Sequence, residues 1–224
     1  MSVKGKRVLI TGSSHGIGAA TAIAFAKEGC SIGLNYNRNP EGAEATAAKI
    51  RELGAPVEIY KADVALSEDC EAMVNAFIQR FGGIDVLVNN AGGALKIPRG
   101  EFIDMPVEYW NDQINLNLNA AAYTSRIAVR NMIENKVRGK IINVSSIHSI
   151  VTWVKRKMLP YCAGKAGLNM FTKALACEVA KYGINVNCIA PGFIMTKLSA
   201  RYSETDMNAF LRKIPAGRLG TVDD

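Results

Sequence analysis

Long hydrophobic runs are missing from this sequence. No apolar run approaches the ~20 residues that a membrane-spanning helix requires. The amino-terminal residues place Lys4, Lys6 and Arg7 around a short strand-like run, and no export signal is visible there. We therefore expect a protein of the cytoplasm with no membrane partner.

Metal ligands are few and scattered. The chain has two histidines, His15 and His148, and five cysteines. The cysteines are odd in number and lack the spacing of metal ligands, which is typical of reduced and mostly buried thiols. We expect no metal site.

The positive charges lack the clustering that is typical of nucleic-acid-binding proteins. The net charge is +7, but the basic residues are dispersed apart from Lys155, Arg156 and Lys157. No usual nucleic-acid-binding motif occurs. A small anionic ligand explains the charge equally well, so we expect no nucleic-acid partner.

Repeats, low-complexity tracts and linkers are also absent, which predicts a single domain covering residues 1–224. Apolar β-rich runs alternate with longer helical patterns, and this favours α/β architecture: a doubly wound parallel sheet with helices on both faces. We expect strands at Arg7–Thr11, Ser31–Asn35, Val57–Lys61, Val86–Asn89, Lys140–Val144 and Asn185–Ile189. We expect helices at about Gly16–Glu28, Glu41–Leu53, Ser67–Phe81, Val107–Asn135 and Tyr161–Lys181.

A glycine-rich turn follows the first predicted strand and leads into an alanine-rich helix. Glycine lets the backbone turn tightly and approach a ligand, and a helix amino terminus offers free amides to a pyrophosphate. The spacing is G-x-x-x-G-x-G, unlike the commonest dinucleotide fingerprint. A purely structural turn is the alternative, but the position after the first strand favours nucleotide binding. The candidate contacts are Gly12, Ser14, His15, Gly16, Ile17 and Gly18.

The end of the second strand indicates which nucleotide binds. An acidic residue there suits a free ribose 2′-hydroxyl, whereas an arginine suits a 2′-phosphate. This chain has Asn37 and Arg38 at that point and no acid until Glu41. Arg38 can hold a phosphate with paired hydrogen bonds, and His15 can add a donor. We predict a preference for NADP(H), with NAD(H) as an alternative cofactor and an exposed loop arginine as the alternative interpretation.

Two further strand ends carry candidate cofactor contacts. Asp63 and Val64 follow the third strand, where Asp63 suits either the adenine edge or helix capping. Asn90, Ala91 and Gly92 follow the fourth strand, where small residues permit close approach of a cofactor. Turn chemistry alone is the alternative for this second segment.

Tyr161 and Lys165 form the candidate catalytic pair. Residues four apart on a helix project from the same side, and a neighbouring cation lowers the pKa of a phenol from its ordinary value of about 10. Ser146 comes shortly after the fifth predicted strand, fifteen residues upstream of Tyr161. The alternative for the pair alone is an amphipathic helix whose lysine extends to solvent.

Taken in order, these motifs resemble the short-chain dehydrogenase/reductase family over almost the whole chain. The branches that look most similar are the 3-oxoacyl-carrier-protein reductases and the glucose 1-dehydrogenases. The resemblance implies a Rossmann-type fold. The matching positions are Thr11–Gly18, Asp63, Asn89–Gly92, Asn117, Ser146, Tyr161, Lys165, Pro191 and Gly192.

The resemblance also implies a role for each catalytic residue. Ser146 is expected to hydrogen-bond the substrate oxygen and Tyr161 to exchange the proton. Lys165 is expected to hold the nicotinamide ribose and to lower the pKa of the tyrosine. Asn117 is expected to hold a water that links Lys165 to solvent.

The nicotinamide end of the cofactor is expected to contact Pro191, Gly192 and Ile194, with Thr196 near the carboxamide or pyrophosphate. The resemblance makes Ser145, Asn115 and Asn119 bystanders, and His148 a pocket wall. The family usually forms tetramers, so a homotetramer or a dimer is expected.

The implied activity is reduction of a 3-oxoacyl thioester or another ketone, with the reverse oxidation of a secondary alcohol. The substrate is a small carbonyl or alcohol compound, which a carrier protein can present. A glucose 1-dehydrogenase-like sugar dehydrogenase is one alternative. A non-catalytic NADP(H)-binding regulator is an alternative of another class.

Two departures from the family pattern stand out. The gap between Ser146 and Tyr161 exceeds the usual spacing of about thirteen residues, and the connection from Gly92 to Trp110 is longer than usual. Basic residues in these loops suggest a mouth that attracts anionic substrates; solvated loop lysines are the alternative. The basic residues are Lys96, Arg99, Lys155, Arg156 and Lys157.

The family also continues with another helix and a final strand, so we expect six strands here and an uncovered sheet edge.

Overall fold

The computed structural model describes residues 2–95, 101–151, 158–196 and 203–224. The basic residues suggested to form a substrate mouth, Lys96, Arg99, Lys155, Arg156 and Lys157, lie outside the described residues.

The described chain forms a six-stranded parallel sheet in the order β3-β2-β1-β4-β5-β6. The chain order reverses between β1 and β4, so the crevice at this point opens at the carboxyl ends of the strands. The strands are β1 (Arg7–Ile10), β2 (Ser31–Tyr36), β3 (Val57–Lys61), β4 (Val86–Asn89), β5 (Lys140–Val144) and β6 (Asn185–Ile189).

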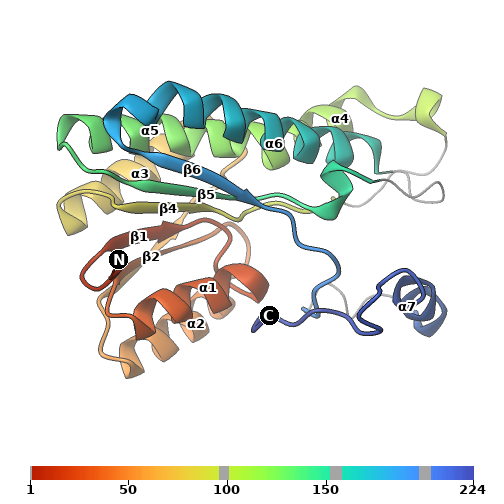
Figure 1. Cartoon of the computed structure of the whole chain (residues 1–224), viewed down its shortest axis with the longest axis horizontal. Helices are drawn as coiled ribbons and strands as arrows, with labels where there is room; N and C mark the ends of the chain where they lie inside the picture. The colour runs from red at the N-terminus through yellow and green to blue at the C-terminus, as the bar shows by residue number, and fades with distance from the viewer. Residues whose placement is uncertain (1, 96–100, 152–157, 197–202) are drawn as a thin grey trace.

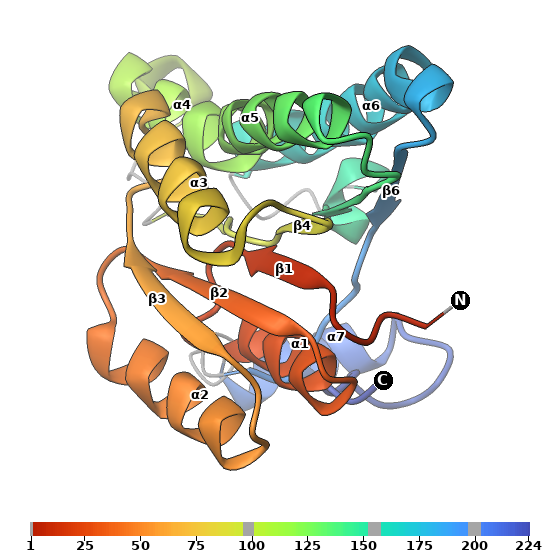
Figure 2. The same cartoon turned by 90° about the vertical axis from the view of Figure 1, so that its left-hand side faces the viewer.

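Helices cover both faces of the sheet, as Figures 1 and 2 show. On one face lie α1 (Gly16–Lys27) and α2 (Pro40–Glu52), and on the other lie α3 (Ser67–Phe81), α4 (Val107–Ile114), α5 (Ala120–Glu134) and α6 (Leu159–Val179). A further helix, α7 (Glu204–Leu211), lies apart from both layers near the carboxyl ends of the strands. The shorter helices are η1 (Phe102–Asp104), η2 (Asn115–Asn119), η3 (Ile147–Ser149) and η4 (Ala180–Tyr182).

The alternation of side chains along β1 divides the core in two. Val8 and Ile10 pack with the residues of α1 and α2, whereas Leu9 packs with those of α3 and α5. All three side chains are fully buried. Both faces of a parallel sheet are covered, which is why its strands read as continuous apolar runs.

The predicted doubly wound sheet is confirmed, and most element boundaries agree within one or two residues. The predicted helix over Val107–Asn135 is confirmed, but it contains a π-helical turn, η2, between α4 and α5 that the sequence did not predict. The helix α7 was not predicted, since its eight residues are too few to show a clear apolar period.

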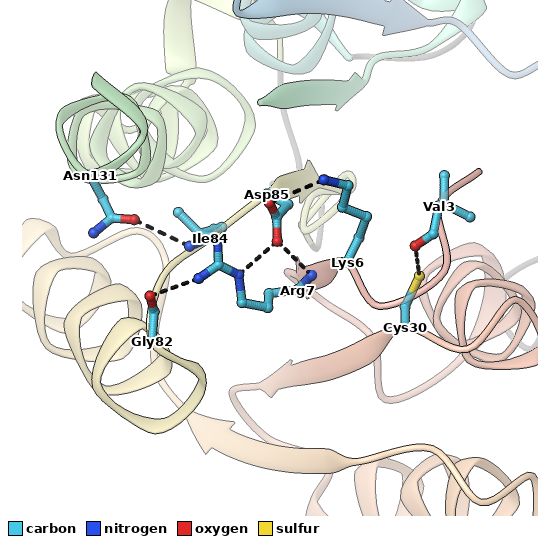
Figure 3. A network of polar contacts seen from close by, with 8 residues as sticks. All are labelled: Val3, Lys6, Arg7, Cys30, Gly82, Ile84, Asp85 and Asn131. Carbon is cyan, nitrogen blue, oxygen red and sulfur yellow. Dashed lines mark hydrogen bonds and ion pairs between the residues drawn. The ribbon is translucent and has the colours of Figure 1, made fainter. Parts of the chain in front are cut away.

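A polar network fastens the amino ends of β1 and β4 (Figure 3). Arg7 Nε donates to Asp85 Oδ2 at 2.7 Å, and Arg7 Nη1 donates to the Gly82 carbonyl at 2.7 Å. Lys6 Nζ lies 3.6 Å from Asp85 Oδ1. The Ile84 amide donates to Asn131 Oδ1 of α5 at 3.2 Å. These contacts lie at the edge of the sheet opposite the crevice and hold the two central strands in register.

We expect the Asp85→Asn substitution to lower the free energy of unfolding by about 1–3 kcal/mol at pH 7. Burial alone raises the pKa of Asp85, but the hydrogen bonds and charge of Arg7 outweigh it and hold the pKa below its ordinary value. The stabilisation is therefore present above the unfolded-state pKa of about 4 and is lost as the pH falls through the folded pKa. Urea unfolding at several pH values measures the difference.

Glu58→Gln is the matched control, because Glu58 pairs with Arg80 at 2.7 Å on the exposed surface. Exposed pairs contribute about 0–1 kcal/mol. An Asp85→Asn deficit that stayed constant down to pH 3 would contradict the ion-pair explanation.

Candidate active site

A crevice of about 660 Å³ lies at the carboxyl edge of the sheet. Residues that follow each of the six strands line it, and so do residues at the start of α6. This is the position at which doubly wound sheets bind their ligands.

The glycine turn is held open by two asparagines. Asn35 Oδ1 accepts from the Gly12 amide at 3.0 Å. Asn90 Nδ2 donates to the Thr11 carbonyl at 2.9 Å and to the Gly12 carbonyl at 3.0 Å. A Cβ atom at Gly18 would lie 2.5 Å from Asn90 Nδ2 and from the Gly12 carbonyl, so only glycine fits there. Gly18 thus shapes the turn without lining the crevice.

The start of α1 faces the crevice without a side-chain cap. His15 is the N-cap residue, and its side chain makes no capping hydrogen bond. Instead, Ser14 Oγ and His15 Nδ1 lie 3.0 Å apart. Gly12 and Gly16 adopt φ angles of 62° and 59° in the left-handed region, which glycine favours. The amides of the first turn are therefore available to an anion.

Arg38 lies on the crevice beside this turn. It is exposed, and no side chain in the described residues hydrogen-bonds or ion-pairs with it. Its neighbour Asn39 has a structural role, since Asn39 Oδ1 accepts from the Gly42 amide at 3.1 Å and caps α2. Asn37 also lines the crevice. The arginine is thus the cation available at the end of β2.

Asp63 and Val64 lie in different surroundings. Asp63 lines the crevice, and Asp63 Oδ1 accepts from the Ala65 amide at 3.0 Å, whereas the N-cap of α3 is Leu66. Val64 is 4% exposed and packs in the core under α3. Its side chain belongs to the core and does not line the crevice, and the cofactor contact of Val64 stays a prediction.

Tyr161 and Lys165 lie one turn apart on α6, and both line the crevice. Lys165 is 3% exposed, and Lys165 Nζ donates to the Val144 carbonyl at 2.8 Å. Burial lowers the pKa of Lys165 to about 8. A Cβ atom at Gly92 would lie 2.9 Å from Lys165 Nζ, so the segment after β4 runs directly against the ammonium group.

Ser145 and Ser146, which follow β5, make different contacts. Ser146 is buried and lines the crevice, and Ser146 Oγ accepts from the His148 amide at 3.1 Å. Ser145 Oγ donates to the Lys165 carbonyl at 3.1 Å, so it joins β5 to α6. Ser145 was predicted to be a bystander, but it supports the helix turn that carries the lysine.

Asn117 lies in the π-helical turn η2 and is 2% exposed. Asn117 Oδ1 accepts from the Gly93 amide at 2.9 Å. Asn117 Nδ2 donates to the Gly93 carbonyl at 3.1 Å and to Gln113 Oε1 at 3.0 Å. Its side chain therefore braces the segment after β4 from behind the crevice, and the expected water link stays a prediction. Asn115 and Asn119 bond to each other at 2.7 Å.

The segment after β6 also lines the crevice. Pro191, Gly192, Ile194 and Thr196 all line it. A Cβ atom at Gly16 would lie 3.4 Å from Thr196 Cγ2, so this segment reaches the start of α1.

Most of the predicted positions are brought together in the crevice; Gly18, Val64 and Asn117 lie behind it. Sequence reasoning missed part of the lining, including apolar residues that no motif marks. The missed lining residues are Tyr36, Asn39, Ala65, Gly93, Ala94, Leu95, Asp112, Leu116, Val144, Ser145, Ile147, Met158 and Phe193. Many of them lie at or shortly after the end of a strand, which was the signal available in the sequence, but Asp112 and Leu116 lie on α4 and η2 and had none.

Among the described residues, no group of three or more histidine, cysteine or acidic side chains could hold a metal ion. Within the same part of the chain, no helix has the length and hydropathy needed to cross a membrane.

Comparison with known proteins decides the family. Residues 6–207 match the family model described as short chain dehydrogenase. The chain belongs to the short-chain dehydrogenase family. It is 39% identical to 3beta-hydroxysteroid dehydrogenase 1 of Eggerthella lenta over 99% of this chain and 84% of that protein. It is 33% identical to glucose 1-dehydrogenase 2 of Bacillus subtilis over 98% of this chain and 84% of that protein.

Solved structures of short-chain dehydrogenases share the fold. A short-chain dehydrogenase from Burkholderia cenocepacia, crystallised in complex with NADP, superposes with a TM-score of 0.90 at 31% identity. The match covers 100% of this chain and 88% of that chain. As a short-chain dehydrogenase, the protein is an oxidoreductase that acts on alcohol and carbonyl groups.

We expect Lys165→Met to increase the stability of the cofactor-free short-chain dehydrogenase at pH 7. The buried ammonium costs free energy, and a pKa lowered from 10.5 to about 8 corresponds to about 3 kcal/mol at about 1.36 kcal/mol per pKa unit. The loss of the Val144 hydrogen bond offsets part of this, so we expect a gain of about 1–3 kcal/mol.

The unfolded chain binds more protons than the folded chain between the folded and unfolded pKa values of Lys165. Wild-type stability therefore rises with pH through this window relative to Lys165→Met. Urea unfolding at pH 7, 8.5 and 10 should show the advantage of the variant shrinking. An advantage independent of pH would contradict a buried charged lysine.

Proposed function

We propose that this short-chain dehydrogenase uses NADP(H) to interconvert a ketone and a secondary alcohol, with Tyr161 as the proton donor and acceptor. One observation carries the proposal. The tyrosine shares a crevice with a buried lysine one helical turn away and with an uncapped glycine turn on the facing helix.

The residues of the crevice fit a dinucleotide. Glycine allows the backbone segments to approach each other closely in this crevice. A Cβ atom at Gly12, for example, would collide with the Cα atom of Ala91 at 2.8 Å. The free amides at the start of α1 suit a pyrophosphate. When bound, the nicotinamide supplies or accepts the hydride.

Three side chains handle the proton and the substrate oxygen. Lys165, fixed by the Val144 carbonyl, is a cation one helical turn from Tyr161 and favours its phenolate. Ser146 donates its hydroxyl hydrogen to the substrate oxygen, where charge develops during reduction. Tyr161 gives its proton to this oxygen during reduction and takes it back during oxidation.

The preference for NADP(H) rests on Arg38. Arg38 is the cation at the end of β2. No carboxylate between Arg38 and Asp63 in the sequence lines the crevice. A guanidinium binds a 2′-phosphate through paired charged hydrogen bonds. The related Burkholderia cenocepacia structure contains NADP, which supports the same choice here.

Apolar walls favour an apolar substrate. The apolar side chains in the described lining of the crevice include Leu95, Ile147, Met158 and Phe193. Such walls suit a ketone or alcohol on an acyl chain or a fused ring better than a sugar, whose hydroxyls require several polar partners. The relatives include a hydroxysteroid dehydrogenase, so 3-oxoacyl thioesters and hydroxysteroids should lead a substrate panel and glucose should follow. Homo-oligomerisation and a cytoplasmic location remain predictions.

We expect Tyr161→Phe to lower kcat by about 10²–10⁴-fold, the usual contribution of a positioned proton donor. The dissociation constant for NADPH, measured by fluorescence, should stay within about twofold. Tyr182→Phe, on an exposed tyrosine, is the matched control and should leave kcat unchanged. A Tyr161→Phe variant with full activity would contradict the proposed chemistry. A wild-type protein that binds NADPH without turning over any substrate would favour the alternative of a non-catalytic NADP(H)-binding regulator.

Arg38→Ala should raise KM for NADPH by about 10–100-fold, because charged hydrogen bonds contribute about 1.5–3 kcal/mol. KM for NADH should change little. Arg51→Ala, on an exposed arginine of α2, is the control. Equal effects of Arg38→Ala on both cofactors would remove the basis for an NADP(H) preference.

A further inference from the structure

Asn169 connects three parts of the active site without lining the crevice. It lies on α6, one turn beyond Lys165 and two turns beyond Tyr161. Asn169 Nδ2 donates to Ser149 Oγ at 2.7 Å, and Asn169 Oδ1 accepts from the thiol of Cys188 on β6 at 3.3 Å. The amide therefore joins the catalytic helix to the turn after β5 and to the last strand.

Ser149 is in turn hydrogen-bonded to Ser146. Ser149 Oγ donates to the Ser146 carbonyl at 2.7 Å, and the Ser149 amide donates to the same carbonyl at 2.9 Å. A hydroxyl has a single hydrogen to donate. Because Ser149 gives it to Ser146, its oxygen can only accept from Asn169, and the amide must present its NH₂ group. The hydrogen bonds from Asn169 to Ser149 and from Ser149 to Ser146 therefore run in one direction.

The chemistry requires such a connection. Ser146 and Tyr161 must reach the same substrate oxygen, and catalytic groups need to be held within about 0.5 Å of productive geometry. Fifteen residues separate the two positions along the chain. The contact from Asn169 through Ser149 bypasses this loop and links the serine turn directly to the helix of Tyr161.

We propose that Asn169 is a positioning residue that fixes Ser146 relative to Tyr161. The inference rests on the proposed roles of those two residues. The thiol of Cys188 holds the far side of the amide and orients it toward Ser149.

Kinetics with NADPH and the best ketone of the panel test the proposal. Asn169→Ala and Ser149→Ala should each lower kcat by about 10–100-fold, since small displacements of catalytic groups cost this much. The dissociation constant for NADPH should stay within about twofold. The double variant should be no slower than the slower single variant, because both substitutions break one connection.

Two further variants sharpen the test. Asn169→Asp keeps the shape of the side chain, but an ionised carboxylate only accepts hydrogen bonds. It should draw the hydrogen of Ser149 away from Ser146 and be as slow as Asn169→Ala. Lys173→Ala, on an exposed residue one turn further along α6, is the control and should retain wild-type kcat.

Hydrogen–deuterium exchange gives a readout that needs no substrate. In Asn169→Ala, the amides of His148 and Ser149 should exchange faster than in the wild type, while those of β1 and β4 are unchanged. If Tyr161→Phe stays active, the proposed chemistry fails, yet the exchange result still tests the connection. Unchanged exchange with unchanged kcat would overturn the proposal, and so would a kcat loss matched by lost NADPH binding and a lower Tm.

Discussion

The active site depends on keeping one lysine ammonium away from water. Lys165 is almost completely buried, and its ammonium donates to the Val144 carbonyl. Desolvation lowers the pKa of Lys165. The folded protein therefore contains a buried charge that reduces the stability of the fold. The same burial strengthens the effect of its charge on a neighbouring phenol, because the field of a cation is screened less away from water.

Much of the surrounding structure is arranged to hold this charge and its neighbours in place. Ser145 binds the backbone of Lys165, and Asn117 braces the segment that includes Gly93. Asn169 extends the same framework to the turn of Ser146 through Ser149. Asn117 and Asn169 do not line the crevice, and each of the three side chains hydrogen-bonds to backbone or to another supporting side chain.

The sequence predicted the sheet well because its strands are short apolar runs between long amphipathic segments, and that alternation permits few topologies. It predicted the glycine turn and the pair on α6 because both depend on local spacing. It did not indicate features that depend on packing. Val64 follows β3 next to Asp63, and only the structure shows that its side chain is buried in the core. The π-helical turn around Asn117 has no pattern in the sequence, since one inserted residue barely disturbs the helical period.

Local spacing therefore determined the alternating α/β order, the glycine turn and the presence of Tyr161 and Lys165 on one helix face. Tertiary structure alone decided that Lys165 is buried, that Ser145 is a support, and that Asn169 meets Ser149. The physical reason is that periodicity and turn chemistry act between residues close in the chain, whereas desolvation and these hydrogen bonds arise between segments about twenty residues or more apart. Such segments become neighbours only once the sheet and its covering helices have assembled.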